Sequence, residues 1–172
     1  FTYGLSGLCN LACRYCDRHT PLAKELSRAE IFKALGEFYE LGMREVSLDG
    51  GEPLAHRHVD EIVQWLVDRH VRVAMNSNGI LIPSKINTVR KLWKLKISVD
   101  GTRRNHDAAR GAGSFEKALA AAHAARRAGM RVEFTCTVGR HNVDAIEELL
   151  EIAEGLQIRV VFQPALNSLF QG

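Results

Sequence analysis

The sequence lacks any long run of apolar residues. No stretch approaches the roughly 18 consecutive apolar residues that a membrane-spanning helix needs. A secretory signal segment is also not visible, although Phe1 is not a natural first residue. We therefore expect no membrane span, and we expect residues 1–172 to form one domain cut from a longer chain.

An excess of charge of one sign is also lacking. The chain has 23 lysines and arginines against 20 acidic residues, a net charge of +3. This excess is too small to indicate a nucleic-acid-binding surface. The short pairs Arg103-Arg104 and Arg126-Arg127 fit a solvated surface. With 46% apolar and 25% charged residues, the composition is that of an ordinary globular domain.

Internal repeats, low-complexity tracts and linkers are missing, and strand patterns alternate with helix patterns instead. Strands are expected at 1–5, 45–49, 71–76, 95–100, 131–137 and 158–163. Helices are expected from a capping box at 27–30, along an apolar stripe at 59–67, at 84–92, from Ser114 to near Gly129, and from Asn142 onward. Such alternation predicts an α/β fold with a parallel sheet and right-handed crossovers.

The strands themselves alternate between apolar and polar residues, whereas a parallel strand covered on both faces is usually apolar throughout. Ile97 and Val99, for example, flank Ser98. One face should therefore meet the helices, and the polar face should line a wet lumen. We expect a partial (β/α)6 TIM-like barrel whose final helix is missing. An open sheet with one face in solvent is the alternative.

Cysteine is scarce, and its distribution is uneven. Cys9, Cys13 and Cys16 fall within eight residues, and Cys136 stands apart. A secreted disulfide framework would spread its cysteines more evenly, so the cluster of thiols indicates a metal site. Cys136 shares the apolar face of its strand and is expected to be an ordinary buried thiol. His56 and His58 are expected at the surface.

The spacing C-x3-C-x2-C lies directly after the first strand, at the end of a parallel barrel where active sites are built. A structural zinc site needs four ligands, and a second pair is missing here. A [4Fe–4S] cluster is usually held by four cysteines. Three cysteines would leave one iron free to bind something else, which is typical of a reactive cluster.

This motif resembles the defining motif of the radical S-adenosylmethionine superfamily, including the aromatic Tyr15 before the last cysteine. Further segments resemble the branch that contains the sulfatase-maturating, quinone-cofactor peptide and molybdenum-cofactor enzymes. They are Gly50-Gly51-Glu52-Pro53, Asn78-Gly79, Ser98-Val-Asp-Gly101, His106-Asp-Ala-Ala-Arg110-Gly111 and the helix start Gly113-Ser-Phe-Glu-Lys. The resemblance covers essentially the whole chain.

The resemblance implies that Cys9, Cys13 and Cys16 bind three irons of a [4Fe–4S] cluster, while the fourth iron chelates S-adenosylmethionine. One electron would then cleave the cofactor into methionine and a 5′-deoxyadenosyl radical, which abstracts hydrogen from a substrate. The cofactor-binding residues that the resemblance implies are Tyr15, Gly50, Gly51, Glu52, Pro53, Asn78, Ser98 and Arg110. Arg110, expected in a loop, would bind the methionine carboxylate.

The partners implied are an electron donor such as a flavodoxin or ferredoxin and a peptide or small-molecule substrate, with peptide modification as the first hypothesis. We expect a cytoplasmic enzyme. A non-catalytic scaffold stabilised by zinc or by a cluster is the alternative function. The terminal Leu169-Phe-Gln-Gly172 resembles part of a protease-site tag.

Overall fold

The structure is a computed structural model, and it describes residues 1–16 and 25–165. Residues 169–172, interpreted above as a tag, therefore lie outside the described part. The strands are β1 (Thr2–Ser6), β2 (Glu45–Gly50), β3 (Arg72–Ser77), β4 (Lys94–Ser98), β5 (Val132–Val138) and β6 (Arg159–Pro164). The helices are α1 (Arg28–Glu40), α2 (Val59–Asp68), α3 (Ile86–Val89), α4 (Arg103–Arg110), α5 (Ser114–Arg127) and α6 (Ile146–Gly155).

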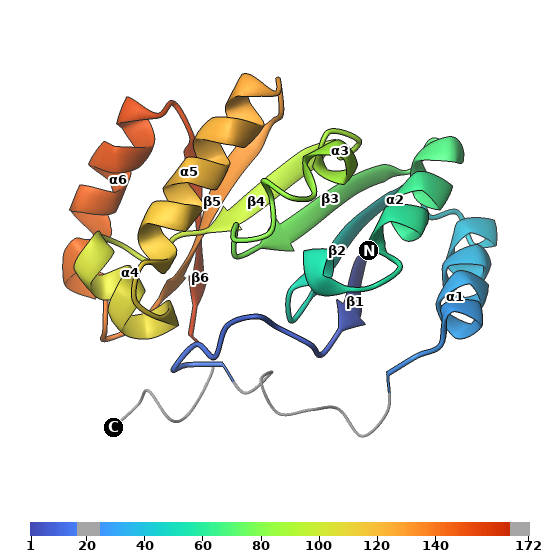
Figure 1. Ribbon diagram of the computed structural model, residues 1–172, viewed down its shortest axis with the longest axis horizontal. Coiled ribbons are helices and arrows are strands. Elements are labelled where there is room, and N and C mark those ends of the chain that lie inside the picture. Colours follow the sequence, from blue (N-terminus) through green and yellow to red (C-terminus); the bar gives the residue numbers. More distant parts are fainter. Residues whose placement is uncertain (17–24, 166–172) are drawn as a thin grey trace.

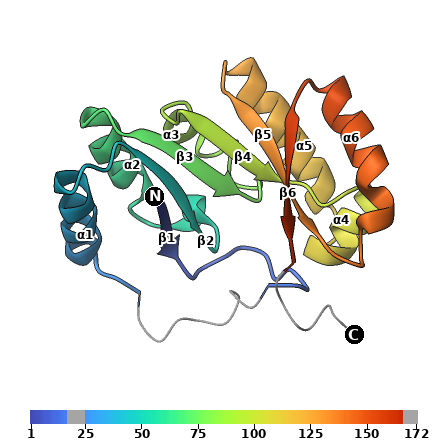
Figure 2. The same cartoon turned by 180° about the vertical axis from the view of Figure 1, so that it is seen from behind.

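The six strands form one parallel sheet in the order of the sequence, β1-β2-β3-β4-β5-β6. Figures 1 and 2 show the helices on one face of this curved sheet and the other face open. The arrangement confirms the expected partial barrel. None of the helices in the described ranges combines the length and apolar character of a membrane span.

The two faces of the sheet differ in chemistry as the alternation predicts. Leu48, Met75, Leu95 and Phe134 are completely buried beneath the helices. The neighbouring positions point the other way, and there the Lys94 ammonium pairs with the Glu133 carboxylate at 3.1 Å. Since side chains alternate along a strand, the pattern that builds the apolar core also builds a polar lumen.

Of two helix starts predicted from the sequence, the structure confirms the one at α1 and contradicts the one at α5. At α1, Ser27 accepts a hydrogen bond from Glu30 N and the Glu30 carboxylate accepts one from Ser27 N, a complete capping box. At α5 the expected cap Ser114 is wrong, because Gly113 is the N-cap residue. The Asp107 carboxylate instead accepts hydrogen bonds from Gly113 N (2.9 Å) and Phe115 N (2.8 Å).

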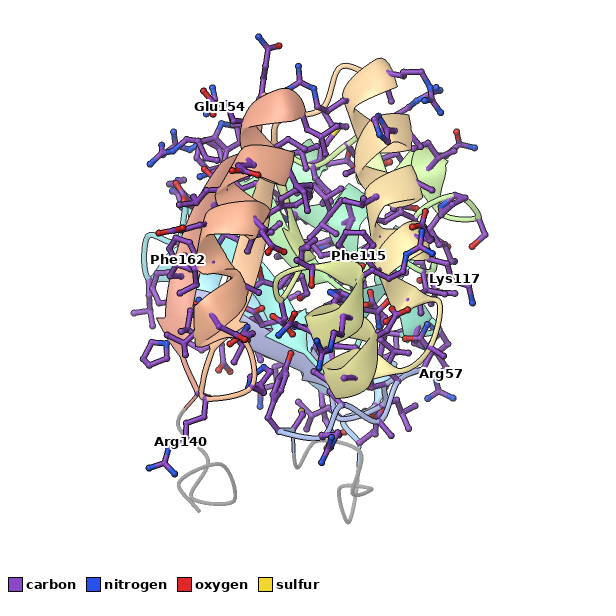
Figure 3. The ribbon with its side chains drawn as sticks, turned by 90° about the vertical axis from the view of Figure 1, so that its left-hand side faces the viewer. Arg57, Phe115, Lys117, Arg140, Glu154 and Phe162 are labelled. Atoms are coloured by element: carbon purple, nitrogen blue, oxygen red, sulfur yellow. The ribbon has the colours of Figure 1, made fainter. Side chains whose placement is uncertain are left out.

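Helix α4 was not expected, since its residues carry no apolar stripe. Its buried face consists of His106, Ala109 and Arg110. Arg110 is therefore the last residue of a helix and not a loop residue. Phe115, near α4 in Figure 3, is buried and meets the His106 ring edge-on at a centroid distance of 5.7 Å.

Three further expectations need correction. The helix expected at 84–92 is reduced to α3, only four residues long. Asn142 does not cap a helix with its side chain, because its amide donates to the carbonyls of Thr137 (2.9 Å) and Asp100 (3.2 Å). His56 is not at the surface: it is 4% exposed, and its Nδ1 accepts a hydrogen bond from His58 N.

We predict that His106 makes the stability of the fold depend on pH. Burial, with a smaller effect of Arg110, lowers the pKa of His106 to about 4, and its Nδ1 accepts a hydrogen bond from Asp100 N at 3.1 Å. The unfolded chain takes up this proton below about pH 6.5, so stability should fall by about 3 kcal/mol as the pH drops from 6.5 to 4. Urea unfolding of the reduced protein at several pH values measures this loss.

The His106→Asn variant provides the control, because asparagine offers an acceptor oxygen that does not titrate. Its free energy of unfolding should change less over the same pH range than that of the wild type. An equal pH dependence in both proteins would contradict the assignment to His106.

Candidate cluster and cofactor site

The candidate site lies at the carboxyl ends of the strands. The segment after β1 crosses these ends toward α4 and β6 (Figures 1 and 2). A cavity of about 290 Å³ opens there. It is lined by Cys9, Leu11, Cys13, Tyr15, Cys16, Asp49, Gly50, Gly51, Asn76, Ser77, Asn78, Ser98, Arg110, Thr135, Thr137 and Gln163. Residues from five of the segments that sequence motifs singled out thus face one space.

The three clustered cysteines lie on a loop that two anchors hold to the barrel. At one end, Asn78 Nδ2 donates to Asn10 Oδ1 at 2.6 Å. At the other, Arg14 N donates to the carbonyl of Ala109, the residue before the end of α4, at 2.8 Å. Both anchors come from strand or helix ends, so the polypeptide itself fixes the position of the loop.

The thiols on this loop are partly withdrawn from water. Cys13 is 8% exposed, and burial raises the pKa of its thiol to about 11. Burial also raises the pKa of Cys9. Because thiolates rather than thiols bind metals, iron has to displace these protons when it binds.

A structural zinc site finds no support. Over residues 1–16 and 25–165, no three or more side chains among His, Cys, Asp and Glu gather as ligands of a single metal ion. Zinc needs four donors within about 2.3 Å of one centre. The thiolates that hold a cluster bind different irons, so they need not converge on one metal ion. Cys136 is completely buried on the helix side, where its sulfur accepts from Asn142 Nδ2, so it is the ordinary buried thiol that was expected.

Gly50 and Gly51 are glycines because the chain before Cys9 passes very close to them. Gly51 N donates to Ser6 O at 2.7 Å, and Gly50 has a φ of +123°. A Cβ atom on Gly51 would lie 2.1 Å from Leu8 O, and one on Gly50 would lie 2.4 Å from Ser6 O. Any larger residue would push the cysteine loop away from β2, so the glycine pair sets the distance between these two walls of the cavity.

Glu52 and Pro53 lie behind the cavity wall and not on it. Glu52 is completely buried, and its carboxylate accepts hydrogen bonds from Asn78 N (2.8 Å), Ser77 Oγ (3.0 Å) and Leu54 N (3.1 Å). Burial raises the pKa of Glu52 against the effect of these bonds. The carboxylate therefore binds the end of β3 to the turn after β2.

Arg110 reaches the cavity but is already engaged by Asp100. Its Nε donates to Asp100 Oδ2 at 2.5 Å and its Nη2 to Oδ1 at 3.3 Å. The Tyr15 hydroxyl donates to Oδ2 at 2.6 Å. Burial opposes ionisation of Asp100, but the charge of Arg110 and these hydrogen bonds outweigh it and hold the pKa of the carboxyl below its ordinary value.

Two buried polar atoms of the cavity lack a hydrogen-bond partner in the described residues, Asn76 Oδ1 and Thr135 Oγ1. Unsatisfied buried polar atoms cost about 1–3 kcal/mol each. A polar ligand in this cavity would satisfy them. Together with three thiols and the close glycine turn, these atoms fit a cluster with a polar cofactor beside it.

Of the cofactor-binding residues expected from the sequence, six line the cavity: Tyr15, Gly50, Gly51, Asn78, Ser98 and Arg110. Glu52 and Pro53, which were expected there too, do not. Sequence reasoning missed Asp100 and Asp49. A signal for Asp100 existed, since it stands two residues after Ser98 and alternation puts both on the polar face. Glu25 was also missed, and its carboxylate accepts from Ser6 Oγ (2.6 Å) and Gly7 N (3.0 Å) just before the cysteine loop.

A partial parallel barrel with a three-cysteine loop over a polar cavity defines an α/β domain built to hold an iron–sulfur cluster and a small polar cofactor. Comparison with known proteins gives the family. Residues 3–153 match the radical SAM superfamily, and the chain belongs to it. Its cofactors are those of that family, a [4Fe–4S] cluster and S-adenosylmethionine.

Curated relatives include heme synthases and mycofactocin maturases. The chain is 33% identical over 162 residues to the AdoMet-dependent heme synthase of Methanosarcina barkeri, with 88% of this chain and 46% of the relative aligned. It is 30% identical over 161 residues to the mycofactocin maturase MftC of Mycolicibacterium smegmatis, with 88% and 41% aligned. The chain thus spans less than half the length of these two relatives.

Solved structures share the fold. SuiB of Streptococcus suis bound to S-adenosylmethionine has a TM-score of 0.83 at 17% identity, with 95% of this chain and 40% of SuiB covered. The enzyme anSMEcpe with bound AdoMet and the Cp18Cys peptide has a TM-score of 0.81 at 20% identity, with 96% and 50% covered. At such identities the likeness supports the barrel architecture alone.

We predict that Cys13→Ala abolishes cluster retention, because two thiolates hold a cluster poorly. Cys136→Ala is the matched control, since it removes a buried thiol on the other face of the sheet. Iron and sulfide per chain after anaerobic reconstitution measure the effect. Iron retained by Cys13→Ala, or lost from Cys136→Ala, would contradict the assignment of the ligands.

Proposed function

We propose that this protein holds a [4Fe–4S] cluster on Cys9, Cys13 and Cys16 and uses it to cleave S-adenosylmethionine reductively, so that the resulting radical abstracts hydrogen from a peptide. The observation that carries the proposal is the shared cavity, where the three thiols, the Gly50-Gly51 turn and the Arg110 guanidinium face one another. We also propose that residues 1–172 are the radical SAM core domain of the enzyme.

The cluster, when bound, supplies the electron that breaks the sulfur–C5′ bond of S-adenosylmethionine. The residues of the chain bind and orient S-adenosylmethionine. Gly50 and Gly51 line the cavity, and their backbone carbonyls can accept hydrogen bonds from an ammonium group. Arg110 carries the matching positive charge for a carboxylate.

The remaining wall residues suit the rest of the cofactor. Ser98, Thr135 and Thr137 present hydroxyls on neighbouring strands β4 and β5, where Ser98 pairs with Thr135 in the register. Tyr15 and Asn78 complete the wall toward the cysteine loop. Glu52 and Pro53 support this wall from behind, and we propose an indirect role in cofactor binding for them.

The proposed chemistry predicts that the full-length enzyme, reconstituted under anaerobic conditions, binds about four irons at this site. Reduced with dithionite in the presence of S-adenosylmethionine, it should release 5′-deoxyadenosine and methionine. Liquid chromatography of the products measures both. A colourless, zinc-loaded protein that releases neither would favour the scaffold function instead.

A peptide is the favoured substrate because the floor of the cavity is rich in hydrogen-bond acceptors. Among the described residues that line it, Asp49 is the one carboxylate. Asn76 Nδ2 donates to Asp49, and because a carboxylate only accepts, this fixes the amide with Oδ1 free. The free oxygen and the carboxylate are suited to the N–H groups of a peptide. SuiB bound to the precursor peptide SuiA shares the fold at a TM-score of 0.80.

The substrate class is tested with the full-length enzyme, S-adenosylmethionine and the short peptides encoded beside its gene. We expect one of these peptides to change in mass and to raise the yield of 5′-deoxyadenosine. Fe-coproporphyrin III serves as the competing substrate, because relatives include Fe-coproporphyrin III synthase. Turnover of the porphyrin without turnover of any peptide would overturn the peptide proposal and leave the radical chemistry intact.

The electron donor we propose is a flavodoxin or a ferredoxin, because S-adenosylmethionine cleavage needs one electron at low potential. We also propose a cytoplasmic enzyme. All four cysteines are free thiols in the structure, which suits a reducing compartment.

A further inference from the structure

One buried carboxylate joins the cysteine loop to the wall that carries Arg110. Asp100 is completely buried at the end of β4, and it accepts hydrogen bonds from Arg110, Tyr15 and Thr137. We propose that Asp100 is a positioning residue that holds the cysteine loop and the Arg110 guanidinium in one arrangement, so that the cluster site and the cofactor site form together. The identity of the two ligands rests on the proposed function.

The geometry of Arg110 shows what Asp100 fixes. The guanidinium is planar and has five N–H groups in a rigid fork. The edge formed by Nε and Nη2 faces the Asp100 carboxylate, so the orientation of the plane is set by two oxygens. Nη1 is the guanidinium nitrogen that these two bonds do not use, and Arg110 lines the cavity.

Tyr15 is the second group that Asp100 fixes. This residue lies between Cys13 and Cys16, and its hydroxyl donates to the same Oδ2 atom that Arg110 Nε contacts. The Arg110 guanidinium also lies 5.5 Å from the centre of the Tyr15 ring. When the cysteine loop moves, Tyr15 moves with it, and Tyr15 is bonded to the same Asp100 carboxylate that orients Arg110.

Asp100 can act as a fixed point because its own position is set by other elements. Thr137 N on β5 donates to Oδ1 at 2.9 Å. The backbone N–H of Asp100 donates to His106 Nδ1 on α4, and the Asp100 carbonyl accepts from Asn142 Nδ2. Three segments other than the cysteine loop thus hold Asp100. The position of the carboxylate is therefore already set when Tyr15 of the cysteine loop binds it.

The test uses the full-length enzyme with its cluster and compares Asp100→Asn, Tyr15→Phe and the double variant. Two quantities are measured on folded, fully loaded protein: the rate at which a chelator removes iron, and the Kd for S-adenosylmethionine by equilibrium dialysis. Tyr15→Phe removes one hydroxyl and keeps the ring, so it should fold even where Asp100→Asn does not.

We expect Tyr15→Phe to speed iron loss and Asp100→Asn to raise both iron loss and Kd by about tenfold or more, because hydrogen bonds to a charged group are involved. The double variant should lose iron no faster than Asp100→Asn alone, since both changes act through one carboxylate. Asp60→Asn is the matched control. Its carboxylate also binds a cation and a hydroxyl, Lys85 and Thr88, but on α2 away from the site, so both quantities should stay at wild-type values.

Variants that melt at lower temperature but keep the wild-type iron loss and Kd would overturn the proposal, because a merely structural role leaves both unchanged. Additive effects of the two substitutions would also overturn it. A wild-type protein that binds neither iron nor S-adenosylmethionine would instead overturn the proposed function, so the two failures are distinguishable.

Discussion

The alternation of apolar and polar side chains along each strand is the constraint on which the rest of this structure depends. It gives the sheet one face that packs beneath the helices, where Leu48 and Phe134 are fully buried, and one face that stays polar. A polar lumen is costly unless water or a polar ligand fills it. The side-chain oxygens of Asn76 and Thr135, which are buried without a hydrogen-bond partner among the described residues, contribute to that cost. The fold therefore keeps a binding site at the expense of some packing energy.

The backbone imposes a second constraint, at the turn after β2. The glycines of this turn are usually considered for the ligand that they can approach, but here they also pack against the chain that leads to Cys9. Backbone bonds of 2.7 Å from Gly51 N to Ser6 O and of 2.8 Å from Glu52 N to Leu8 O join the two segments. Glu52 then extends the connection to β3. Gly50 and Gly51 thus line the cavity, and the bonds of Gly51 and Glu52 set the place of the chain that leads to Cys9.

Much of the fold could be predicted from the sequence, since strand alternation and the capping box at Ser27 are local signals. The errors arise where a tertiary partner replaces a local one. Ser114 does not cap α5, because Asp107, on a helix without an apolar stripe, accepts hydrogen bonds from Gly113 N and Phe115 N. The Ser114 hydroxyl donates to Asp107 and to the Gly111 carbonyl instead. At the site, the motif residues were found, but the partners of Arg110 were not, because a salt bridge over ten residues leaves no periodic trace. Asp100 is part of the motif Ser98-Val-Asp-Gly101, but the sequence does not indicate that its carboxylate binds Arg110.

The charges of the site follow from this pairing. The carboxylate of Asp100 neutralises Arg110 within the wall, so the cavity does not present a bare cation, and a ligand carboxylate has to share the guanidinium with Asp100. Sharing is possible because Asp100 binds Nε and Nη2 and does not bind Nη1. Asp49, by contrast, accepts hydrogen bonds from the neutral groups of Asn76 and Ser47, which leave its charge in place. The two ends of the cavity therefore differ: one is preorganised for an anionic group, and the other attracts donors and cations. That polarity suits the zwitterionic methionine moiety of S-adenosylmethionine.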